Sequence, residues 1–551
     1  MGDVCGAEVL VRNLKAQGVK HVFGIPGAKV DRVYDCLNGS GIETVVCRHE
    51  QNAAFIAAGV GKMTGQAGVC LVTSGPGCTN LVTGFATANS EGMPLVGLGG
   101  SVPRAEIMKQ THQSLDTVNL FRPVTRYAAE IEAGESIGEI LANAFRAAES
   151  GRRGAAYVSL PNDVMNDPAP DRVLTPARVP RLGAAPEEEI AEAVRLIEAA
   201  SLPVLLLGMD ASRPANAAAV RALLSAHPLA TVCTYQGAGV VPRAALDCFG
   251  GRIGLFHNQP SDRLLDAADL VIAIGYNPIE YDAGLWNAGK TRPVIHIDHV
   301  IAAVDVDYRP AVELYGDIAA TLARIAAELP RRPRLVPHAA LDAARRELEE
   351  VRAAGARESG MPMHPLRIIS DLQPFITEDV TLALDIGSFY IWHSRYLYSF
   401  RPEQLLISNG QQTLGVALPW AIAACLARPN DKVLSVSGDG GFLFSAQELE
   451  TAVRLKCNFV HMIWRDGSYN MVAFQEMMKY QRHSGIDFGP IDTVKYAEAF
   501  GATGFRVEHA DQFVPILRKA METPGPVLID IPVDYRHNIE LGAAMHDNVI
   551  S

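Results

Sequence analysis

Two apolar runs that each lead to an aspartate form one unit of the sequence: Lys432-Val-Leu-Ser-Val-Ser-Gly-Asp439-Gly440 and Asn458-Phe-Val-His-Met-Ile-Trp-Arg-Asp466. Between them, Ser445-Ala-Gln-Glu448 predicts a capping box that opens an amphipathic helix reaching Lys456. A strand, a helix and a second strand make a right-handed crossover with parallel strands. Asp439 and Asp466 are therefore expected at the same carboxyl edge of one sheet, where open α/β folds bind ligands. Two carboxylates beside glycine-rich backbone suit a hard cation that carries a diphosphate.

The length and charge of the chain limit what it can be. Its 551 residues are too many for one core and fit about three domains of ~150 residues each. The formal net charge is −12, and no run of Lys or Arg is longer than a pair. The chain therefore lacks the basic surface of a nucleic-acid-binding protein. A small anionic substrate would need local positive groups instead.

Short apolar runs alternate with helical patterns along the chain, which predicts parallel sheets flanked by helices. The expected fold class is α/β, with three consecutive doubly wound parallel-sheet domains at residues 1–168, 185–335 and 360–551. Stretches rich in Pro and Arg separate these segments. The clearest predicted strands outside the Asp439 unit are residues 21–23, 43–47, 69–73, 94–98, 156–160, 203–208, 270–275 and 294–298.

The cysteines and the absence of a long apolar stretch bear on location. The nine Cys form no Cys-x-x-Cys pair, their number is odd, and most lie in apolar runs, as buried thiols do in a reducing compartment. The first residues lack a basic region followed by an apolar segment, and no uninterrupted apolar run reaches membrane-spanning length. We therefore expect a cytoplasmic protein with no nucleic-acid or membrane partner.

The Asp439 unit resembles a known motif. A Gly-Asp-Gly followed at this distance (466 − 439 = 27 residues) by Asn or Asp is similar to the thiamine diphosphate and magnesium motif of the thiamine enzymes. Many members carry Asn where this chain has Asp466, which adds a negative charge but keeps an oxygen ligand. The resemblance implies that Asp439, Asp466 and the main-chain carbonyl of Ser468 hold Mg²⁺. It covers nearly the whole chain, because the family is built from a pyrimidine-binding, a central and a diphosphate-binding domain in this order.

Two motifs of the first segment fit the same family. Glu50, between the strand ending at Cys47 and an apolar helix, resembles the family's catalytic glutamate, which shares a proton with the aminopyrimidine ring. The plainer interpretation is a first-turn acid favoured by the helix dipole. The turn Thr73-Ser-Gly-Pro-Gly77 brings backbone close to a neighbouring group, and in this family the matching stretch frames the cofactor pocket across a subunit contact. The active site would then need at least a dimer.

Longer matches indicate one branch of the family. Lys109–Asp116, Ser408–Trp420 and Tyr469–Gln475 look closely like the catabolic, flavin-independent acetolactate synthases. Leu414 falls at the position of the apolar side chain that bends the cofactor. By this resemblance the cofactor-binding residues are Gly387, Ser388, Gln412, Leu414, Gly438, Asp439, Gly440, Gly441, Asp466, Ser468, Tyr469, Met471 and Val472.

The same resemblance bears on the substrate. Gln475 occupies a position where biosynthetic acetohydroxyacid synthases place a Trp that favours 2-ketobutyrate, so pyruvate is expected as both donor and acceptor. Gln113 could hydrogen-bond the intermediate or the second carbonyl, and Lys29 could face a carboxylate, although both could equally be solvated loop residues. The expected catalytic residues are therefore Glu50, Gln113, Lys29 and Gln475.

The resemblance implies an acetolactate synthase that condenses two pyruvate into 2-acetolactate and CO₂, through a thiamine-bound hydroxyethyl carbanion or enamine. It also implies a homo-oligomer, at least a dimer and expected as a tetramer, with active sites at the subunit interface. FAD is not expected. Gln236-Gly-Ala-Gly239 lacks the third glycine of a dinucleotide fingerprint, although several relatives bind flavin without one.

Other functions stay open at this point. They are a flavin-containing biosynthetic acetohydroxyacid synthase, another thiamine-dependent 2-keto acid decarboxylase or carboligase, and a catalytically silent relative that serves as a binding subunit. The sequence also leaves open whether the reaction serves fermentation to acetoin and butanediol or branched-chain amino acid biosynthesis.

Overall fold

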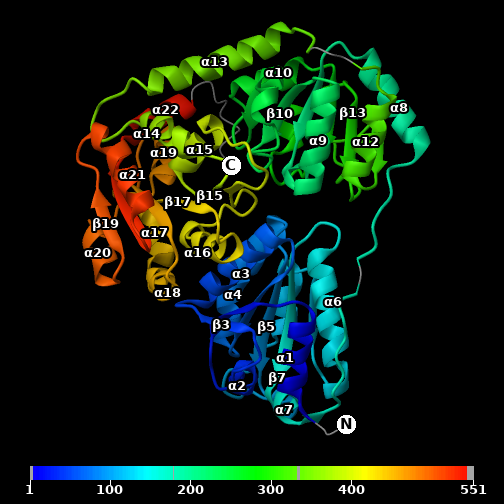
Figure 1. Cartoon of the computed structure of the whole chain (residues 1–551), viewed down its shortest axis with the longest axis vertical. Coiled ribbons are helices and arrows are strands. Elements are labelled where there is room, and N and C mark those ends of the chain that lie inside the picture. Colours follow the sequence, from blue (N-terminus) through cyan, green and yellow to red (C-terminus); the bar gives the residue numbers. More distant parts are fainter. Residues whose placement is uncertain (1–3, 178, 332–334, 543–551) are drawn as a thin grey trace.

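The computed structural model describes residues 4–177, 179–331 and 335–542. These residues form three six-stranded sheets, each with all its strands parallel, and one two-stranded antiparallel ribbon (Figure 1). The predicted α/β class with three doubly wound sheets is confirmed, while the exact domain boundaries stay a prediction. Among the described residues no helix is long and apolar enough to cross a membrane.

The first unit contains β1 (Val4–Cys5), α1 (Gly6–Ala16), β2 (His21–Ile25), α2 (Asp31–Leu37), β3 (Glu43–Val46), α3 (Glu50–Thr64), β4 (Gly68–Val72), α4 (Pro76–Ser90), β5 (Leu95–Ser101), α5 (Thr117–Phe121), β6 (Tyr127–Glu130), α6 (Ile137–Glu149), β7 (Ala155–Pro161), α7 (Asn162–Asn166) and β8 (Pro168–Ala169). Its sheet has the order β3-β2-β4-β5-β7-β6.

The second unit contains α8 (Glu187–Ala199), β9 (Pro203–Leu207), α9 (Pro214–Ala226), β10 (Ala230–Thr234), β11 (Phe249–Ile253), α10 (Pro260–Ala267), β12 (Leu270–Ile274), α11 (Ala283–Trp286), β13 (Val294–Asp298), β14 (Val312–Tyr315) and α12 (Ile318–Glu328). Its sheet order is β11-β10-β9-β12-β13-β14. Helix α13 (Ala339–Gly355) then runs across to the third unit (Figure 1).

The third unit contains α14 (Pro365–Leu372), β15 (Val380–Leu384), α15 (Ser388–Tyr396), β16 (Leu405–Leu406), α16 (Ala417–Ala427), β17 (Lys432–Gly438), α17 (Asp439–Ser445), α18 (Leu449–Arg454), β18 (Phe459–Arg465), α19 (Asn470–Tyr480), α20 (Thr493–Ala499), β19 (Thr503–Arg506), α21 (Phe513–Glu522), β20 (Pro526–Pro532) and α22 (Asn538–Leu541). Its sheet order is β16-β15-β17-β18-β20-β19.

The strand orders place the ligand sites. When strands are numbered along the chain within each unit, the first and third sheets share one order. The side on which successive strands are added changes between β2 and β4 in the first sheet and between β15 and β17 in the third. Ligands of open α/β sheets bind outside the carboxyl ends of strands at such a reversal. The central sheet instead has the strand order of the dinucleotide-binding fold.

The first and third units share one hydrophobic core. Helix α3 packs against α16, and these helices are rich in alanine, so their backbones approach closely (Figure 1). Ala57 of α3 and Trp420 of α16 are both completely buried. Helix α3 begins at Glu50, and thus the position of this acid is tied to the third unit of the same chain.

The capping box predicted at Ser445–Glu448 is wrong. Residues 446–448 form a 3-10 turn, and α18 ends at Arg454. The Ser445 hydroxyl donates to Asn52 Oδ1 at 2.9 Å, and Glu448 accepts from the backbone N–H groups of Arg48 at 2.6 Å and His49 at 3.1 Å. Ser445 and Glu448 therefore bond to groups of the first unit and not to each other's backbone. Those groups are partly or fully buried and need hydrogen-bond partners.

Packing of the first sheet predicts a cost for one added methyl group. A Cβ on Gly97 of β5 would lie 2.1 Å from the ring of Phe85, which is completely buried. We expect Gly97→Ala to lower the free energy of unfolding by about 1–3 kcal/mol, because the ring cannot move without disturbing the core. Urea unfolding checks this, with Gly183→Ala as the control, since a Cβ there meets only open space. Equal losses in both variants would contradict the packing argument.

Candidate active site

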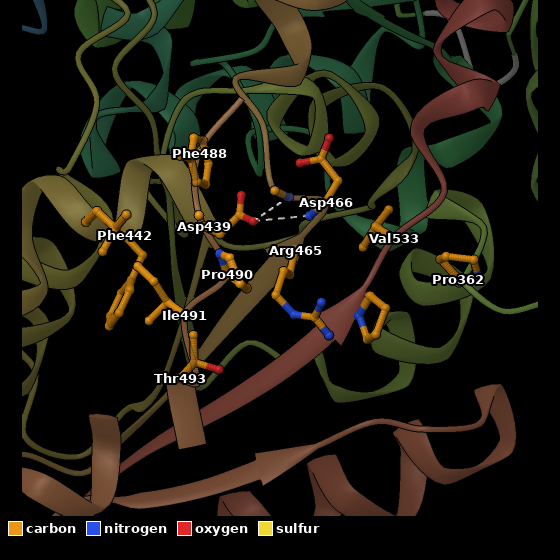
Figure 2. Close-up of a pocket in the computed structure, with 14 residues that line it drawn as sticks. Pro362, Asp439, Phe442, Arg465, Asp466, Phe488, Pro490, Ile491, Thr493 and Val533 are labelled. Carbon is orange, nitrogen blue, oxygen red and sulfur yellow. Dashed lines mark hydrogen bonds between the residues drawn. The ribbon is translucent and has the colours of Figure 1, made fainter. Parts of the chain in front are cut away.

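Asp439 and Asp466 meet at the carboxyl edge of the third sheet, as the sequence predicted. Asp439 begins α17 directly after β17, and Asp466 directly follows the neighbouring parallel strand β18. One carboxylate oxygen of Asp439 accepts from the backbone N–H of Gly467 at 2.7 Å and of Asp466 at 3.2 Å (Figure 2). The other accepts from Gly440 N at 3.0 Å. Asp439 thereby fixes the turn that carries Asp466.

Asp466 is held from its other side. Its Oδ2 accepts from Ser468 Oγ at 2.7 Å and from Asn470 Nδ2 at 2.9 Å. Burial raises the pKa of Asp466 to about 6, and the nearby charge of Asp439 adds to this rise. Burial also raises the pKa of Asp439, against the backbone N–H groups that stabilise its charged form. A divalent cation would relieve the repulsion of two such buried carboxylates.

A cavity of about 240 Å³ opens beside the two aspartates. Every residue predicted to bind the cofactor lines it, from Gly387 to Val472, and so does Gln475. The sequence missed four of its lining residues: Ile386, Phe389, Asn470 and Tyr535. A second cavity, of about 380 Å³, lies on the side of Phe442 and Phe488 and shares the two aspartates (Figure 2).

One glycine in the Gly-Asp-Gly turn is required by close packing. A Cβ on Gly440 would lie 2.7 Å from the ring of Tyr469 and 3.4 Å from that of Phe488. These two rings pack edge to face with centroids 5.2 Å apart. The loop that carries Phe488 is joined to the Asp466 turn, because Phe488 N donates to the carbonyl of Gly467 at 3.2 Å. The backbone around Asp439 is thus fixed before any ligand arrives.

The remaining predicted catalytic residues lie at the carboxyl edge of the first sheet. Glu50 follows β3 and accepts from Asn80 Nδ2 at 2.9 Å. Gln113 follows β5, has φ of 62° and accepts from Ser74 Oγ at 2.8 Å. Lys29 follows β2. Both reversal points in the chain therefore carry predicted site residues.

The structure does not bring these two groups together within one chain. The lining of the 240 Å³ cavity comes only from residues 386–535, so Glu50, Gln113 and Lys29 are absent from it. Gln475 is the one predicted catalytic residue that reaches it. A single chain thus has two half-sites, one at the edge of the first sheet and one at the edge of the third.

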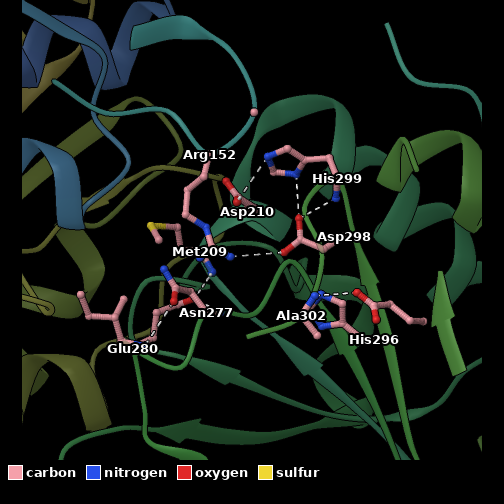
Figure 3. Close-up of polar contacts among 12 residues, drawn as sticks. Arg152, Met209, Asp210, Asn277, Glu280, His296, Asp298, His299 and Ala302 are labelled. Atoms are coloured by element: carbon pink, nitrogen blue, oxygen red, sulfur yellow. Dashed lines mark hydrogen bonds and ion pairs between the residues drawn. The ribbon is translucent and has the colours of Figure 1, made fainter. Parts of the chain in front are cut away.

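A polar cluster occupies the carboxyl edge of the central sheet (Figure 3). His299 Nδ1 lies 2.7 Å from Asp298 Oδ1 at the end of β13. Asp210 pairs with Arg213 at 2.7 Å, and Arg152 reaches from the first unit to within 3.8 Å of Asp298. Asp210, Asp298 and His299 are close enough to share a cation, but the two arginines already balance both carboxylates.

Three family models match the chain along its length. They are described as the N-terminal TPP binding domain, the central domain and the C-terminal TPP binding domain of thiamine pyrophosphate enzymes, and they match residues 5–120, 190–325 and 385–531. The chain belongs to the thiamine pyrophosphate enzyme family. The matched ranges contain the two sheet edges that carry the half-sites.

Relatives from this family match the whole chain. A catabolic acetolactate synthase of Raoultella terrigena is 53% identical over 543 residues, which cover 98% of this chain and 97% of the relative. An acetolactate synthase of Bacillus subtilis (strain 168) is 51% identical, with 98% and 95% covered. The large subunit of acetolactate synthase isozyme 2 of Escherichia coli (strain K12) is 30% identical, with 97% and 96% covered. The predicted family and likeness to the catabolic branch are confirmed, while the roles of single site residues stay predictions.

The raised pKa of Asp466 predicts how metal binding depends on pH. The group is neutral below about pH 6 and charged above it, so Mg²⁺ affinity in the presence of thiamine diphosphate should fall as the pH drops through that value. Calorimetric Mg²⁺ titrations between pH 5 and 8 measure this. Asp466→Asn keeps an oxygen ligand without the titrating proton and should show a shallower dependence, which also corrects for titration of the diphosphate. The same slope in both proteins would contradict Asp466 as the group whose titration controls metal binding.

Proposed function

We propose that this protein is an acetolactate synthase that condenses two pyruvate into 2-acetolactate and CO₂, with thiamine diphosphate and Mg²⁺ as cofactors. The observation that carries the proposal is the likeness, above half identity over almost the full length, to two acetolactate synthases, one of them catabolic. The gathering of all predicted cofactor-binding residues around one cavity supports it independently.

The residues present fit the cofactor and its metal. Asp439, Asp466 and the carbonyl of Ser468 supply hard oxygen ligands of the kind that Mg²⁺ prefers. Bound thiamine diphosphate would supply the electron sink that decarboxylation of pyruvate needs. Leu414 lines the cavity with an apolar side chain against which the cofactor can bend. Gln475, in the same cavity, leaves room for the methyl group of pyruvate as acceptor without an aromatic wall.

The residues of the first half-site handle the proton and the carboxylates. Glu50 is placed to hold the proton that it shares with the aminopyrimidine ring, and Asn80 orients its carboxylate. Gln113 is fixed beside the glycine turn by Ser74 and can donate its amide N–H to a substrate oxygen. Lys29 supplies a positive charge to an otherwise acidic protein, suited to the carboxylate of a 2-keto acid.

Two chains must combine for these roles to be filled at one site. Glu50 and the 240 Å³ cavity belong to separate half-sites of the chain. Exposed apolar side chains surround each: Met108 and Leu115 near Gln113, and Val472, Met477 and Met478 along α19. Because burying such surfaces favours association, we propose a homodimer at least, with a tetramer as the expected assembly, in which each cavity receives the first unit of another chain.

A flavin is not part of the proposal, although the central sheet has the strand order of a dinucleotide-binding fold. Charged side chains of the protein lie at the carboxyl edge of that sheet and are paired with one another or with backbone N–H groups. Glu280 is buried there and accepts from the N–H groups of Met209 and Asn277 at 3.0 Å each (Figure 3). At the same edge, Asp298 pairs with both Arg152 and His299. A biosynthetic, flavin-containing synthase is the second candidate.

Incubation with pyruvate, thiamine diphosphate and Mg²⁺ without flavin tests the proposal. We expect one acetolactate for each CO₂, and Glu50→Gln should lower kcat by about 10²-fold or more while the fold persists, because the shared proton is lost. Acetolactate is measured as acetoin after acid treatment, and circular dichroism checks the fold.

Three other outcomes would point elsewhere. CO₂ with acetaldehyde would indicate a decarboxylase, turnover only after FAD is added would indicate the flavin-containing branch, and no binding of thiamine diphosphate would indicate a silent relative. Preference for 2-ketobutyrate over pyruvate as acceptor would contradict the role given to Gln475.

A further inference from the structure

Two buried side chains, Trp392 and Asn538, and the partly buried Asn470 connect the C-terminal helix α22 to the carboxylate of Asp466. Trp392 Nε1 donates to Asn538 Oδ1 at 2.9 Å, and Asn538 Nδ2 donates to Asn470 Oδ1 at 2.6 Å. Asn470 Nδ2 then donates to Asp466 Oδ2 at 2.9 Å. We propose that Trp392, Asn538 and Asn470 form a relay that positions Asp466 for the metal, so that α22 contributes to Mg²⁺ affinity. This proposal rests on the metal site proposed above.

The chemistry of the two ends fixes the direction of the relay. The indole N–H of Trp392 can only donate, and an ionised carboxylate such as Asp466 can only accept. Each amide between them must therefore present its oxygen toward Trp392 and its NH₂ toward Asp466. The observed contacts all run in this direction. The oxygen of Asn470 also accepts from Ser388 Oγ at 3.2 Å, which favours the same orientation of this amide.

The identity of residue 466 explains why a donor is needed there. An asparagine at this position would offer one oxygen to a metal and carry its own NH₂ on the other side, whereas Asp466 presents two oxygens. If one oxygen binds the cation, the other needs donors in a buried site. Ser468 Oγ and Asn470 Nδ2 are those donors, at 2.7 and 2.9 Å. Outer partners of this kind set the orientation and affinity of a metal ligand.

The far end of the relay is well anchored. Trp392 is completely buried, and only 2% of the surface of Asn538 is exposed. Helix α22 is held by its last residue, because the carbonyl of Leu541 accepts from Arg395 Nη1 at 3.3 Å and from Asn258 Nδ2 at 2.5 Å. Asn538 also donates to Ser388 Oγ at 2.7 Å, and Ser388 lines the cofactor cavity. A segment more than 70 residues beyond Asp466 thus reaches the site.

Reversing the relay tests its direction. Asn538→Asp cannot donate to Asn470, so Asn470 flips and turns its oxygen toward Asp466, and Mg²⁺ affinity should fall about tenfold. Asp466→Asn alone sets two NH₂ groups against each other and should also weaken binding. In the double variant the contacts of Asn470 with positions 538 and 466 can both form in the opposite direction, Trp392 still donates to position 538, and the total charge is unchanged. Its affinity should therefore exceed the value expected if the two losses multiplied.

Calorimetric titration of Mg²⁺ into protein saturated with thiamine diphosphate measures these affinities, and thermal unfolding without cofactor reports the fold. Ile539→Ala is the control, since this neighbouring side chain of α22 is 66% exposed and outside the relay. It should bind Mg²⁺ like the wild type. If Asn538→Asp does not fold, Asn538→Ala removes the donor without burying a charge and should weaken binding severalfold.

The outcomes separate this proposal from the proposed function. If the wild type binds no Mg²⁺ with thiamine diphosphate, the metal site itself is wrong and the relay falls with it. If the wild type binds but Asn538→Asp or Asn538→Ala binds equally well, the relay does not position Asp466. If both single losses simply multiply in the double variant, the two residues are not coupled and the relay is likewise overturned. A purely structural role of Asn538 would lower the unfolding temperature without this recovery.

Discussion

The carboxylate of Asp439 accepts hydrogen bonds from the backbone N–H groups of Gly440, Asp466 and Gly467. These contacts join the end of β17 to the turn after β18. The position of Asp466 and of the loop attached to Gly467 depends on them. Asp466 is delivered to the same cavity, and the loop that carries Phe488 is attached to the adjoining Gly467. Preorganised backbone of this kind positions a ligand without reorganisation when it binds.

The fold uses the same strand order twice, and in the proposed function each copy supplies a different part of the chemistry. The first sheet carries Glu50 and Gln113 at its carboxyl edge, and the third carries the aspartates and the cavity at its own. Within one chain, α3 and α16 join these sheets through a shared core, so the half-sites keep a fixed relation to each other. The backbone N–H groups of Arg48 and His49, in the loop before Glu50, donate to the carboxylate of Glu448 and strengthen that junction. In the proposed assembly, a second chain brings the complementary halves face to face.

Much of this could be predicted from the sequence, because the decisive patterns are local. Apolar runs that end in glycine or acid predicted the central strands, and their parallel pairing placed Asp439 and Asp466 together. Edge strands such as β16, with two residues, carry too little pattern to be found. The capping box failed because Arg48, His49 and Asn52, almost 400 residues away, compete for Glu448 and Ser445. A pattern in the local sequence cannot predict hydrogen-bond partners that lie so far away in the chain.

Long-range contacts also explain why the sequence did not predict some residues of the site. Tyr535 and Asn538 follow no motif: Tyr535 lines the cavity, and Asn538 is joined to it by hydrogen bonds to Ser388 of α15 and Asn470 of α19. Asn470 stood inside a recognised stretch, but its role depends on partners from two other segments. The sequence offered one signal for Asn470: an aspartate at position 466 needs a nearby hydrogen-bond donor.

The central claim is that a complete site takes Glu50 from one chain and Asp439 from another. Coexpression of Glu50→Gln and Asp439→Asn chains with different affinity tags, followed by isolation of the mixed oligomers, tests it most directly. If the halves come from different chains, the isolated mixed dimers recover about half of the wild-type acetolactate synthesis, because one of the two sites in each mixed dimer is intact. If both halves come from the same chain, every site in the mixed oligomer lacks one group, and activity no higher than that of the two parent variants would contradict the account.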